Sequence, residues 1–509
     1  MQLKKLSLTN FRAFKQAELE FKPGMNLIVG VNGVGKSTVL GVISILMSML
    51  LPKFTASKSA PKDFSDSDIR KQSVSIFPKR KQIIAKHTDY WKSFSIQLRA
   101  DDIFLQKMSR SQRKGKVTSF TTMVEFETNQ IPFKYSYQKT LQKYGLVQAA
   151  STSDDEFSYQ LTRRDRIGIR RRNVEGYDLG VRDNLDPKES EIPAHLKTGS
   201  EQPLVVIYST RRSNFRGEKI RAGSRLSGQQ LAFSDSLRDR ELNWVDFAYW
   251  WLAQEELGRE TGKKIFGHRM LVLSRVISYF MDSFSNFRVE RKIYNRKNDK
   301  GEDEKIEDIQ LLIDKDRIPV PVTLLSDGER GLLFLIIDLA RRLTQANPKL
   351  PDPLCDGKAI VLIDELDLHL HPQWQRDVVE KLTRTFPNCQ FIATTHSPQI
   401  IGEVPPDRII LLQREDNQVY VQQNNIFGYG HDSGWILRHL MDTESRNSET
   451  SAQIASIENA LEEGDIYGAR HEIELLRKVL VGDDDEVKRL EASIANLEAS
   501  ADENDSEIS

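Results

Sequence analysis

The chain has 509 residues, which is too long for one compact core and predicts two to four domains. It carries 73 basic and 73 acidic residues, but residues 444–509 hold 18 acidic against 6 basic side chains, a net charge of −12 that leaves +12 on residues 1–443. A basic body with an acidic tail suits an anionic ligand for the body and a partner for the tail, although a mixed surface with a solvated tail explains the same counts.

The cysteines and the apolar stretches indicate a cytoplasmic protein. Cys355 and Cys389 are the only two cysteines and lack metal-ligand spacing, which argues against a disulfide framework and fits a reducing compartment. Residues 1–14 have no apolar signal core. The longest apolar-rich stretch, residues 39–51, is too short to span a bilayer, so we expect a buried core helix there and no membrane contact.

Taken in chain order, the apolar patterns predict alternating strands and helices. Strands are predicted at residues 3–9, 25–29, 204–208, 359–363, 390–394, 408–412 and 418–422, with strand-like alternation within 90–147 and a hairpin around a charged turn at 295–307. Helices are predicted after residue 37, ending at Pro52, and at 241–284, 327–345, 372–386, 398–402, 450–463, 466–480 and 484–499. The polar segments 53–89 and 148–200 are interpreted as surface insertions. Strand, helix, strand in this rhythm predicts an α/β fold with a mainly parallel sheet and right-handed crossovers.

A glycine-rich loop follows the strand at 25–29. Residues 30–37, GVNGVGKS, fit the pattern of a glycine, four residues and then Gly-Lys-Ser, between a strand and a helix. Glycines let backbone N–H groups turn inward around phosphates, Lys36 supplies a positive charge, and the Ser37 hydroxyl can complete a Mg²⁺ shell. The alternative is a glycine-rich turn without a ligand. The predicted binding residues are Gly30, Asn32, Gly33, Gly35, Lys36, Ser37 and Thr38.

Two later strands end in residues suited to phosphate chemistry. The strand at 359–363 runs into Asp364 and Glu365, and ligands of parallel sheets bind at this carboxyl edge. Asp364 is the candidate Mg²⁺ ligand, and Glu365 is the candidate that polarises the attacking water. His396 follows the next strand and is either a structural histidine or a hydrogen-bond partner of the γ-phosphate or the water. The predicted catalytic residues are therefore Lys36, Glu365 and His396.

The stretch LLSDGERG, residues 324–331, reads as a helix start. Ser326 with Glu329 three residues later is a capping-box pattern, and the N–H groups at such a start favour an anion. Gly328 allows a close backbone approach. The alternative is an ordinary cap on a core helix.

Taken together, these motifs resemble the soluble SMC, Rad50, RecF and OLD branch of the ABC-type ATPases. The resemblance rests on LTNFRAF, GMNLIVGVNGVGKST, LLSDGERG, IVLIDELDLHLHP and IATTHSP. It implies a P-loop ATPase head with ATP and Mg²⁺ as cofactors and with LLSDGERG as the signature motif. In this family Ser326 and Gly328 would face the nucleotide of a second copy, so that two heads enclose ATP, and Asp367 would act across the same interface. Asp327 and Glu329 stand where Gly and Gln are commoner, and the family's Q-loop glutamine has no clear counterpart.

Three clusters of arginine and lysine lie in the middle of the chain. They lie at Lys107–Lys116, at Arg163–Arg172 and at Arg211–Arg221. Each is either solvated surface or a contact to the phosphates of DNA or RNA. Arg211 and Arg212, directly after the strand at 204–208, have the further alternative of a structural salt bridge.

The C-terminal part resembles ATPases of two-gene bacterial antiphage modules, the PtuA family of Septu and related retron systems. The similar segments are FGYGHDSGWIL, residues 442–446 and the helical hairpin IENALEEGDIYGARHEIELL. The resemblance implies a homo-oligomeric ATPase that controls a separate HNH endonuclease, PtuB. The sequence contains no HNH, Ser-His-Asp or metal cluster, and the acids at 483–486 begin a predicted helix, so no nuclease site of its own is expected. A RecF-like DNA-binding clamp and a non-catalytic ATP-binding scaffold are the alternatives.

These predictions divide the chain into five parts. We expect an N-terminal part of the head with the phosphate loop, insertions with a β-rich lobe, a helical and hairpin lobe, a C-terminal part of the head, and a helical acidic region for partner docking. Their expected bounds are 1–52, 53–240, 241–323, 324–425 and 426–509.

Overall fold

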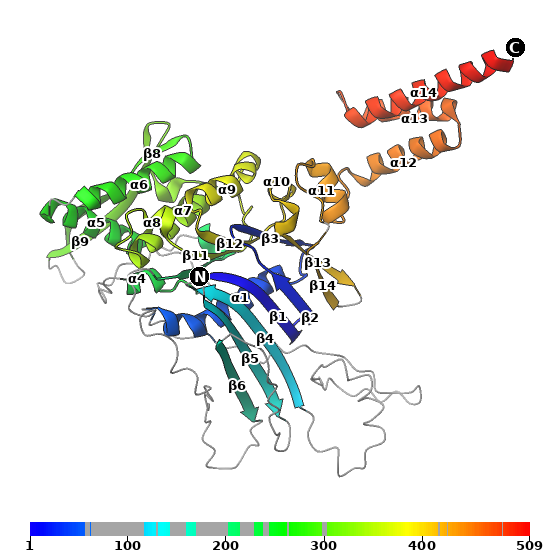
Figure 1. Cartoon of the computed structure of the whole chain (residues 1–509). Coiled ribbons are helices and arrows are strands. Elements are labelled where there is room, and N and C mark those ends of the chain that lie inside the picture. Colours follow the sequence, from blue (N-terminus) through cyan, green and yellow to red (C-terminus); the bar gives the residue numbers. More distant parts are fainter. Residues whose placement is uncertain are drawn as a thin grey trace, which may run out of the picture. The chain divides into compact units, whose positions relative to one another are not determined.

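The chain forms two compact units, Met1–Gly430 and His431–Ser509 (Figure 1). The computed structural model describes residues 1–55, 57, 62, 117–128, 131–142, 159–168, 202–213, 229–237, 244–261, 264–297, 303–415, 418–424, 426–480 and 482–508. The predicted basic cluster at 107–116 lies outside these residues, as do Arg170–Arg172, Arg216, Lys219 and Arg221, and the strand-like run at 93–100.

A six-stranded sheet carries the motif-bearing strands. The strands are β3 (Met25–Gly30), β7 (Leu204–Tyr208), β11 (Ala359–Ile363), β12 (Cys389–Thr394), β13 (Ile409–Glu415) and β14 (Gln418–Gln422). Their order is β14-β13-β3-β12-β11-β7, parallel throughout except for β14 at the edge. Every residue of β3, β11 and β12 is buried, as in parallel strands covered on both faces. The predicted α/β class and strands are confirmed.

Helices connect these strands in the predicted rhythm. They are α1 (Lys36–Phe54), α7 (Asp327–Ala346), α8 (Pro353–Asp356), α9 (Pro372–Thr385) and α10 (Pro398–Gly402). The expected end of α1 at Pro52 is wrong, because the helix continues to Phe54. A proline in the last turn removes only one intrahelical hydrogen bond, and the N–H of Thr55 still reaches the carbonyl of Leu51 at 2.9 Å.

A second sheet of five strands contains the N-terminus. Its order is β2-β1-β4-β5-β6, with bounds β1 (Gln2–Phe11), β2 (Phe14–Glu20), β4 (Val117–Thr128), β5 (Ile131–Gln142) and β6 (Tyr159–Gly168). Within the segment 148–200, which the sequence indicates as a surface insertion, β6 forms the edge strand of this sheet and pairs in parallel with β5 (Figure 1). Backbone pairing at a sheet edge tolerates a polar sequence, so composition alone did not reveal this strand.

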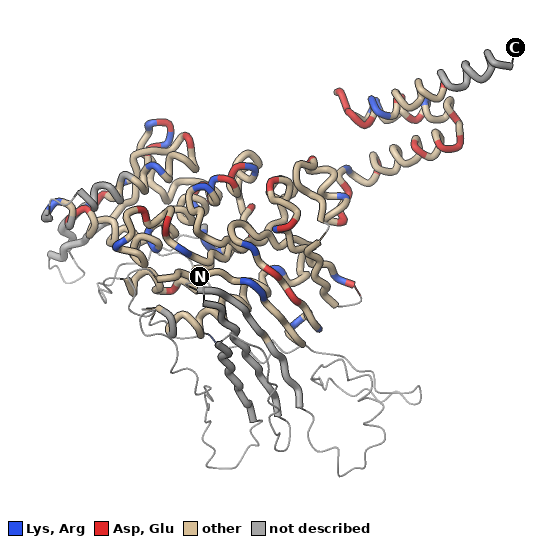
Figure 2. The backbone as a smooth tube through the Cα atoms, viewed as in Figure 1, with Lys and Arg blue, Asp and Glu red and all other residues tan. Residues whose placement is uncertain are grey.

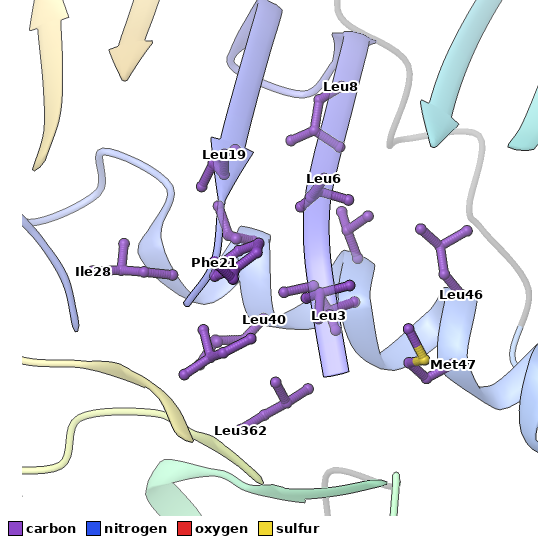
Figure 3. Close-up of a cluster of buried hydrophobic side chains, with 14 of the residues drawn as sticks. Leu3, Leu6, Leu8, Leu19, Phe21, Ile28, Leu40, Leu46, Met47 and Leu362 are labelled. Carbon is purple, nitrogen blue, oxygen red and sulfur yellow. The ribbon is translucent and has the colours of Figure 1, made fainter. Parts of the chain in front are cut away.

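The two sheets share one apolar core with α1. Leu3 and Leu6 of β1 pack with Leu40 and Leu46 of α1 and with Leu362 of β11, and all five are buried (Figure 3). This core fixes the helix that starts at Lys36 against both sheets. The predicted buried helix at 39–51 is confirmed.

A helical and hairpin lobe precedes the signature stretch. It comprises α4 (Gln230–Phe233), α5 (Trp244–Thr261), α6 (Lys264–Phe280), β8 (Phe284–Lys297), β9 (Asp303–Lys315) and β10 (Ile318–Pro321). β8 and β9 form the predicted antiparallel hairpin. Phe247, Trp251 and Phe287 pack ring against ring between α5 and β8, with centroids 5.0–6.0 Å apart.

The C-terminal unit consists of α11 (Ser433–Leu440), α12 (Ser448–Glu462), α13 (Ile466–Val479) and α14 (Asp485–Ile508). The last three confirm the predicted helices and share a core that includes Ile457, Ile473 and Leu490. A run of acidic residues, 483–486, lies at the start of α14 (Figure 2). Within it, Asp484 accepts backbone hydrogen bonds from Glu486 and Val487 and forms an ion pair with Arg446, which is a capping role. Among the residues that the structure describes, no helix is long and apolar enough to cross a membrane.

Candidate functional site: a phosphate loop facing a pair of acids

The glycine-rich loop joins β3 to α1 and has the backbone of a phosphate cradle. Gly30, Gly33 and Gly35 have φ angles of +143°, +74° and +117°, which residues with a side chain rarely adopt. At Gly30 an added Cβ would also lie 2.3 Å from the carbonyl oxygen of Leu412. Asn32 and Gly33 are exposed at the tip of the loop. The conformation turns backbone N–H groups towards a ligand next to the start of a helix.

Lys36, the first residue of α1, is folded back onto the loop. Its Nζ donates to the carbonyls of Gly30 at 2.7 Å and Val31 at 3.1 Å, and the side chain is 6% exposed. Burial lowers the pKa of Lys36 to about 8, against the opposing attraction of Glu365 and the other nearby acids. Here Lys36 donates to backbone carbonyls, and a phosphate chain in this loop would give the buried ammonium a negatively charged partner.

Ser37 and Asp364 meet at the carboxyl edge of the sheet. The Ser37 hydroxyl donates to Oδ1 of Asp364 at 3.0 Å, and the buried hydroxyl of Thr394 donates to the same oxygen at 2.7 Å. Hard oxygen donors beside a phosphate cradle are the ligands that Mg²⁺ prefers, with water and phosphate completing the octahedron. The residues therefore fit this ion, and Ser37 and Asp364 are the side chains that would hold it.

Glu365 sits on a strained backbone directly after β11. Its φ is +49°, and a non-glycine residue in that region costs about 1–3 kcal/mol unless its surroundings hold it there. The hydroxyl of Thr394 accepts its N–H at 2.7 Å, and Arg212 donates to its carbonyl at 2.5 Å. These contacts fix where the side chain leaves the main chain.

Asp367 and His396 are held together one strand away. Oδ1 of Asp367 accepts the hydroxyl of Thr395 at 2.6 Å and the N–H of His396 at 3.1 Å. Burial, followed by the positive charge of Lys36, lowers the pKa of the His396 imidazole, so the ring is uncharged at neutral pH. A neutral ring can either donate or accept a hydrogen bond at the edge of the sheet.

The signature stretch begins α7 with the predicted capping box. The Ser326 hydroxyl accepts the N–H of Glu329 at 3.3 Å, and the N–H of Ser326 donates to the Glu329 carboxylate at 2.9 Å. Both unusual acids are paired within the chain: Glu329 with Lys315 at 2.6 Å, and Asp327 with Arg330. These partners neutralise the charge that the two substitutions add.

Gly328 is required by a contact within the chain. An added Cβ would lie 2.0 Å from the carbonyl oxygen of His369, so the main chain after Asp367 presses directly against the start of α7. The prediction of a close approach at Gly328 is correct, but the group that the structure places there belongs to the same chain. The start of α7 and the segment after Asp367 are thus in direct contact.

The structure brings the predicted residues of the phosphate loop, the strand-end acids and His396 to one edge of the sheet. Sequence reasoning missed Thr394, which bridges Asp364 and Glu365, and Arg12, which donates to the Thr38 hydroxyl at 3.2 Å. The position of Thr394 at the end of a strand beside β11 was a usable signal. Arg12 lies within LTNFRAF, one of the motifs that carry the resemblance, and its φ of +47° belongs to the turn between β1 and β2.

Two family models match adjoining parts of the chain. The AAA ATPase domain matches residues 1–165, and the AAA domain described as a putative AbiEii toxin of a type IV TA system matches residues 157–402. The DNA replication and repair protein RecF of Magnetococcus marinus is 54% identical over 46 residues, which is 9% of this chain and 12% of RecF. Over residues 1–402 the chain is therefore similar to AAA ATPase domains, and over a short stretch it is similar to RecF.

This ATPase is also similar to retron and Septu proteins. The retron Vc95 probable ATPase of Vibrio cholerae is 24% identical over 91% of this chain and 84% of its own length. The retron Ec83 probable ATPase of Escherichia coli is 39% identical, and the match spans 33% of this chain and 28% of that protein. Septu protein PtuA of Bacillus thuringiensis is 35% identical over 24% of this chain and 33% of PtuA.

Among solved structures, the SMC head domain from Thermotoga maritima matches 84% of this ATPase and all of that chain, at 13% identity and a TM-score of 0.37.

Proposed function

We propose that this ATPase is the ATP-driven subunit of a bacterial antiphage defence system and controls a separate HNH-type nuclease through association of its heads. The observation that carries the hydrolytic part is the hydrogen-bonded set of Ser37, Asp364 and Thr394 beside Glu365. The likeness to the retron and PtuA proteins supports the defence role.

In the proposed mechanism, Lys36 leaves the carbonyls of Gly30 and Val31 and donates to the outer phosphates of ATP. Ser37 and Asp364 would hold Mg²⁺, and the ion would supply positive charge that neutralises the phosphates. Glu365 accepts a hydrogen bond from the attacking water and aligns it with the γ-phosphorus, while neutral His396 donates to a γ-phosphate oxygen. Phosphoryl transfer to water needs chiefly this positioning and charge neutralisation, because the protein forms no covalent bond to the substrate.

The head–head association rests on the signature stretch. Ser326 and Gly328 open α7, whose free N–H groups and dipole attract an anion, and we assign that anion to the γ-phosphate bound by a second copy. Asp327 and Glu329 already have basic partners, so they do not oppose this contact. Asp367 would link closure of the dimer to the active site, because it accepts hydrogen bonds from Thr395 and His396.

The variant Glu365→Gln tests the ATPase assignment. We expect hydrolysis to fall about 100-fold or more, with ATP binding retained and ATP-dependent dimers accumulating in size-exclusion chromatography. The matched control is Glu415→Gln at the exposed end of β13, which should hydrolyse ATP like the unaltered protein. Equal, slow hydrolysis by Glu365→Gln and the unaltered chain would instead favour a non-catalytic scaffold.

The nuclease partner needs its own test. We propose the acidic helical region, 426–509, as the docking surface, because a net charge of −12 on residues 444–509 suits a basic partner. The full chain should co-purify with an HNH protein encoded next to it, and the pair should reduce phage plating only when Lys36 is intact. Protection by this ATPase without any nuclease partner would overturn the assignment.

A RecF-like role in DNA repair is the second candidate, and the short match to RecF favours it. In that case duplex DNA should stimulate hydrolysis in the absence of other proteins, and no HNH protein should co-purify.

A further inference from the structure

Arg212 is a buried cation that the mechanism above does not use. It lies in the short 3₁₀ turn Thr210–Ser213 after β7 and is 4% exposed. Its guanidinium donates to three backbone carbonyls: those of Asp364 at 2.6 Å, Glu365 at 2.5 Å and Ser209 at 3.3 Å. Burying a charged group is costly unless its donors are satisfied, and here they are satisfied by main-chain oxygens. The neighbouring Arg211 is exposed, so the two arginines have different surroundings.

The carbonyls that Arg212 holds belong to the two acids of the site. The pairing register of β11 with β7 and β12 ends at Ile363. The N–H of Asp364 still donates to the carbonyl of Tyr208, the last residue of β7, at 2.8 Å. Glu365 adopts its φ of +49° at this point. A planar guanidinium can grip two successive carbonyls at once, which fixes the turn between them.

The same segment is tied to the signature helix. The hydroxyl of Tyr208 donates to Oδ2 of Asp338 on α7 at 3.1 Å. Asp338 is 1% exposed and is paired with Arg341 and Arg342 of its own helix, and Arg342 also donates to the carbonyls of Ala232 and Ser234. This network is buried and fully paired, so it ties α7 rigidly to the end of β7.

We propose that Arg212 is a positioning residue for Asp364 and Glu365, and that Tyr208 with Asp338 fixes its segment to α7, so that the helix starting at the signature and the acids after β11 move together. The inference rests on the roles proposed for those two acids. A displacement of Ser326 by an arriving second head would reach Glu365 through α7, Tyr208 and Arg212.

Arg212→Lys is the primary test. A lysine keeps the positive charge but cannot donate to two carbonyls in a fixed fork. We expect kcat for ATP to fall about 10- to 100-fold, with KM and the ATP dissociation constant within about threefold of the unaltered protein. The matched control is Arg211→Lys in the same turn, which should leave both constants unchanged. A kcat for Arg212→Lys within twofold of the control would overturn the proposal, and so would equal losses in binding and turnover.

Tyr208→Phe serves as the second variant, because it removes one hydroxyl and keeps the buried ring. We expect a smaller fall in kcat, about three- to tenfold, with ATP binding retained and a thermal unfolding curve that remains cooperative. An unchanged kcat for Tyr208→Phe would show that the bond between Tyr208 and Asp338 does not affect catalysis. If Arg212→Lys does not fold, that unchanged kcat would by itself contradict the proposal. Glu365→Gln, measured in parallel, separates the two failures: if it too hydrolyses ATP normally, the assignment of the acids is at fault, not the role of Arg212.

Discussion

The hydroxyl of Thr394 donates to Oδ1 of Asp364 at 2.7 Å, and the oxygen of that hydroxyl accepts the N–H of Glu365 at 2.7 Å. One threonine at the end of β12 therefore orients both the proposed Mg²⁺ ligand and the proposed water-activating residue, which directly follow β11. Supporting contacts of this kind set the geometry of a metal ligand as much as the ligand itself does.

Thr394→Val should separate these functions from packing. Valine has nearly the same shape but leaves the N–H of Glu365 without a partner, which costs about 1–3 kcal/mol. We expect a lower unfolding temperature, a higher Mg²⁺ concentration for half-maximal activity and a kcat reduced about 10-fold. Thr383→Val on α9, where the hydroxyl bonds only to carbonyls of its own helix, is the matched control and should leave the Mg²⁺ dependence unchanged.

The pH dependence of ATP capture should report Lys36. Its pKa of about 8 in the free protein means that the ammonium is protonated below that pH and loses its charge above it. Since kcat/KM follows the free enzyme, it should fall about tenfold per pH unit above 8. Lys36→Arg cannot lose its charge in this range, so its profile should be flat between about pH 7 and 9.5, although at lower activity. A midpoint near the ordinary lysine value would contradict the burial argument.

Gly328→Ala should damage the signature without touching the phosphate loop. The new methyl group would lie 2.0 Å from the carbonyl of His369, so the start of α7 or the segment after Asp367 must shift. We expect a loss of ATP-dependent dimers and a destabilisation of about 1–3 kcal/mol, measured by chromatography and chemical unfolding. Gly41→Ala within α1 is the contrast: it has open space around it and should stabilise the chain by about 0.5–1 kcal/mol.

Glu329 should act through capping and pairing. Burial opposes its ionisation, but hydrogen bonds from Lys315 and Ser326 outweigh this and lower the pKa of the carboxyl. Glu329→Gln retains an acceptor for the N–H of Ser326, so its ATP affinity should stay within about threefold. Glu329→Ala loses the box and should cost about 1 kcal/mol of stability. A tenfold tighter ATP affinity for Glu329→Gln would show that the acid is unpaired when two heads meet.

Several parts of the candidate site coincide with strong local signals in the sequence. β3, β11 and β12 are buried, mostly apolar strands; Gly30 ends β3, Thr394 ends β12 and Asp364 directly follows β11, and a parallel sheet must bring such ends to one edge. The capping box at Ser326 depends on residues three positions apart and could be read directly. The hairpin of β8 and β9 was signalled by a charged turn between two strand-like runs.

The misses have a different physical origin. β6 contains arginines and an aspartate, and it is a strand because β5 offers it a free edge 17 residues earlier in the chain. Arg212 left two interpretations open, because only the folded path of β7 beside β11 shows that its guanidinium meets two carbonyls instead of a phosphate. The contact that requires a glycine at position 328 is likewise made by the main chain at His369, about 40 residues away in the sequence, so local patterns do not predict it.

The strand order also bears on how the protein is made. β3, which carries the phosphate loop, lies between β12 and β13, so both of its neighbours are synthesised more than 350 residues after it. At translation rates of about 5–20 residues per second, that delay is roughly 20–70 seconds. During this time β3 has no partner on either side, and it is among the most apolar segments of the chain. The nascent ATPase should therefore depend on chaperones until β13 emerges, and fragments that end before β12 should neither bind ATP nor remain in solution.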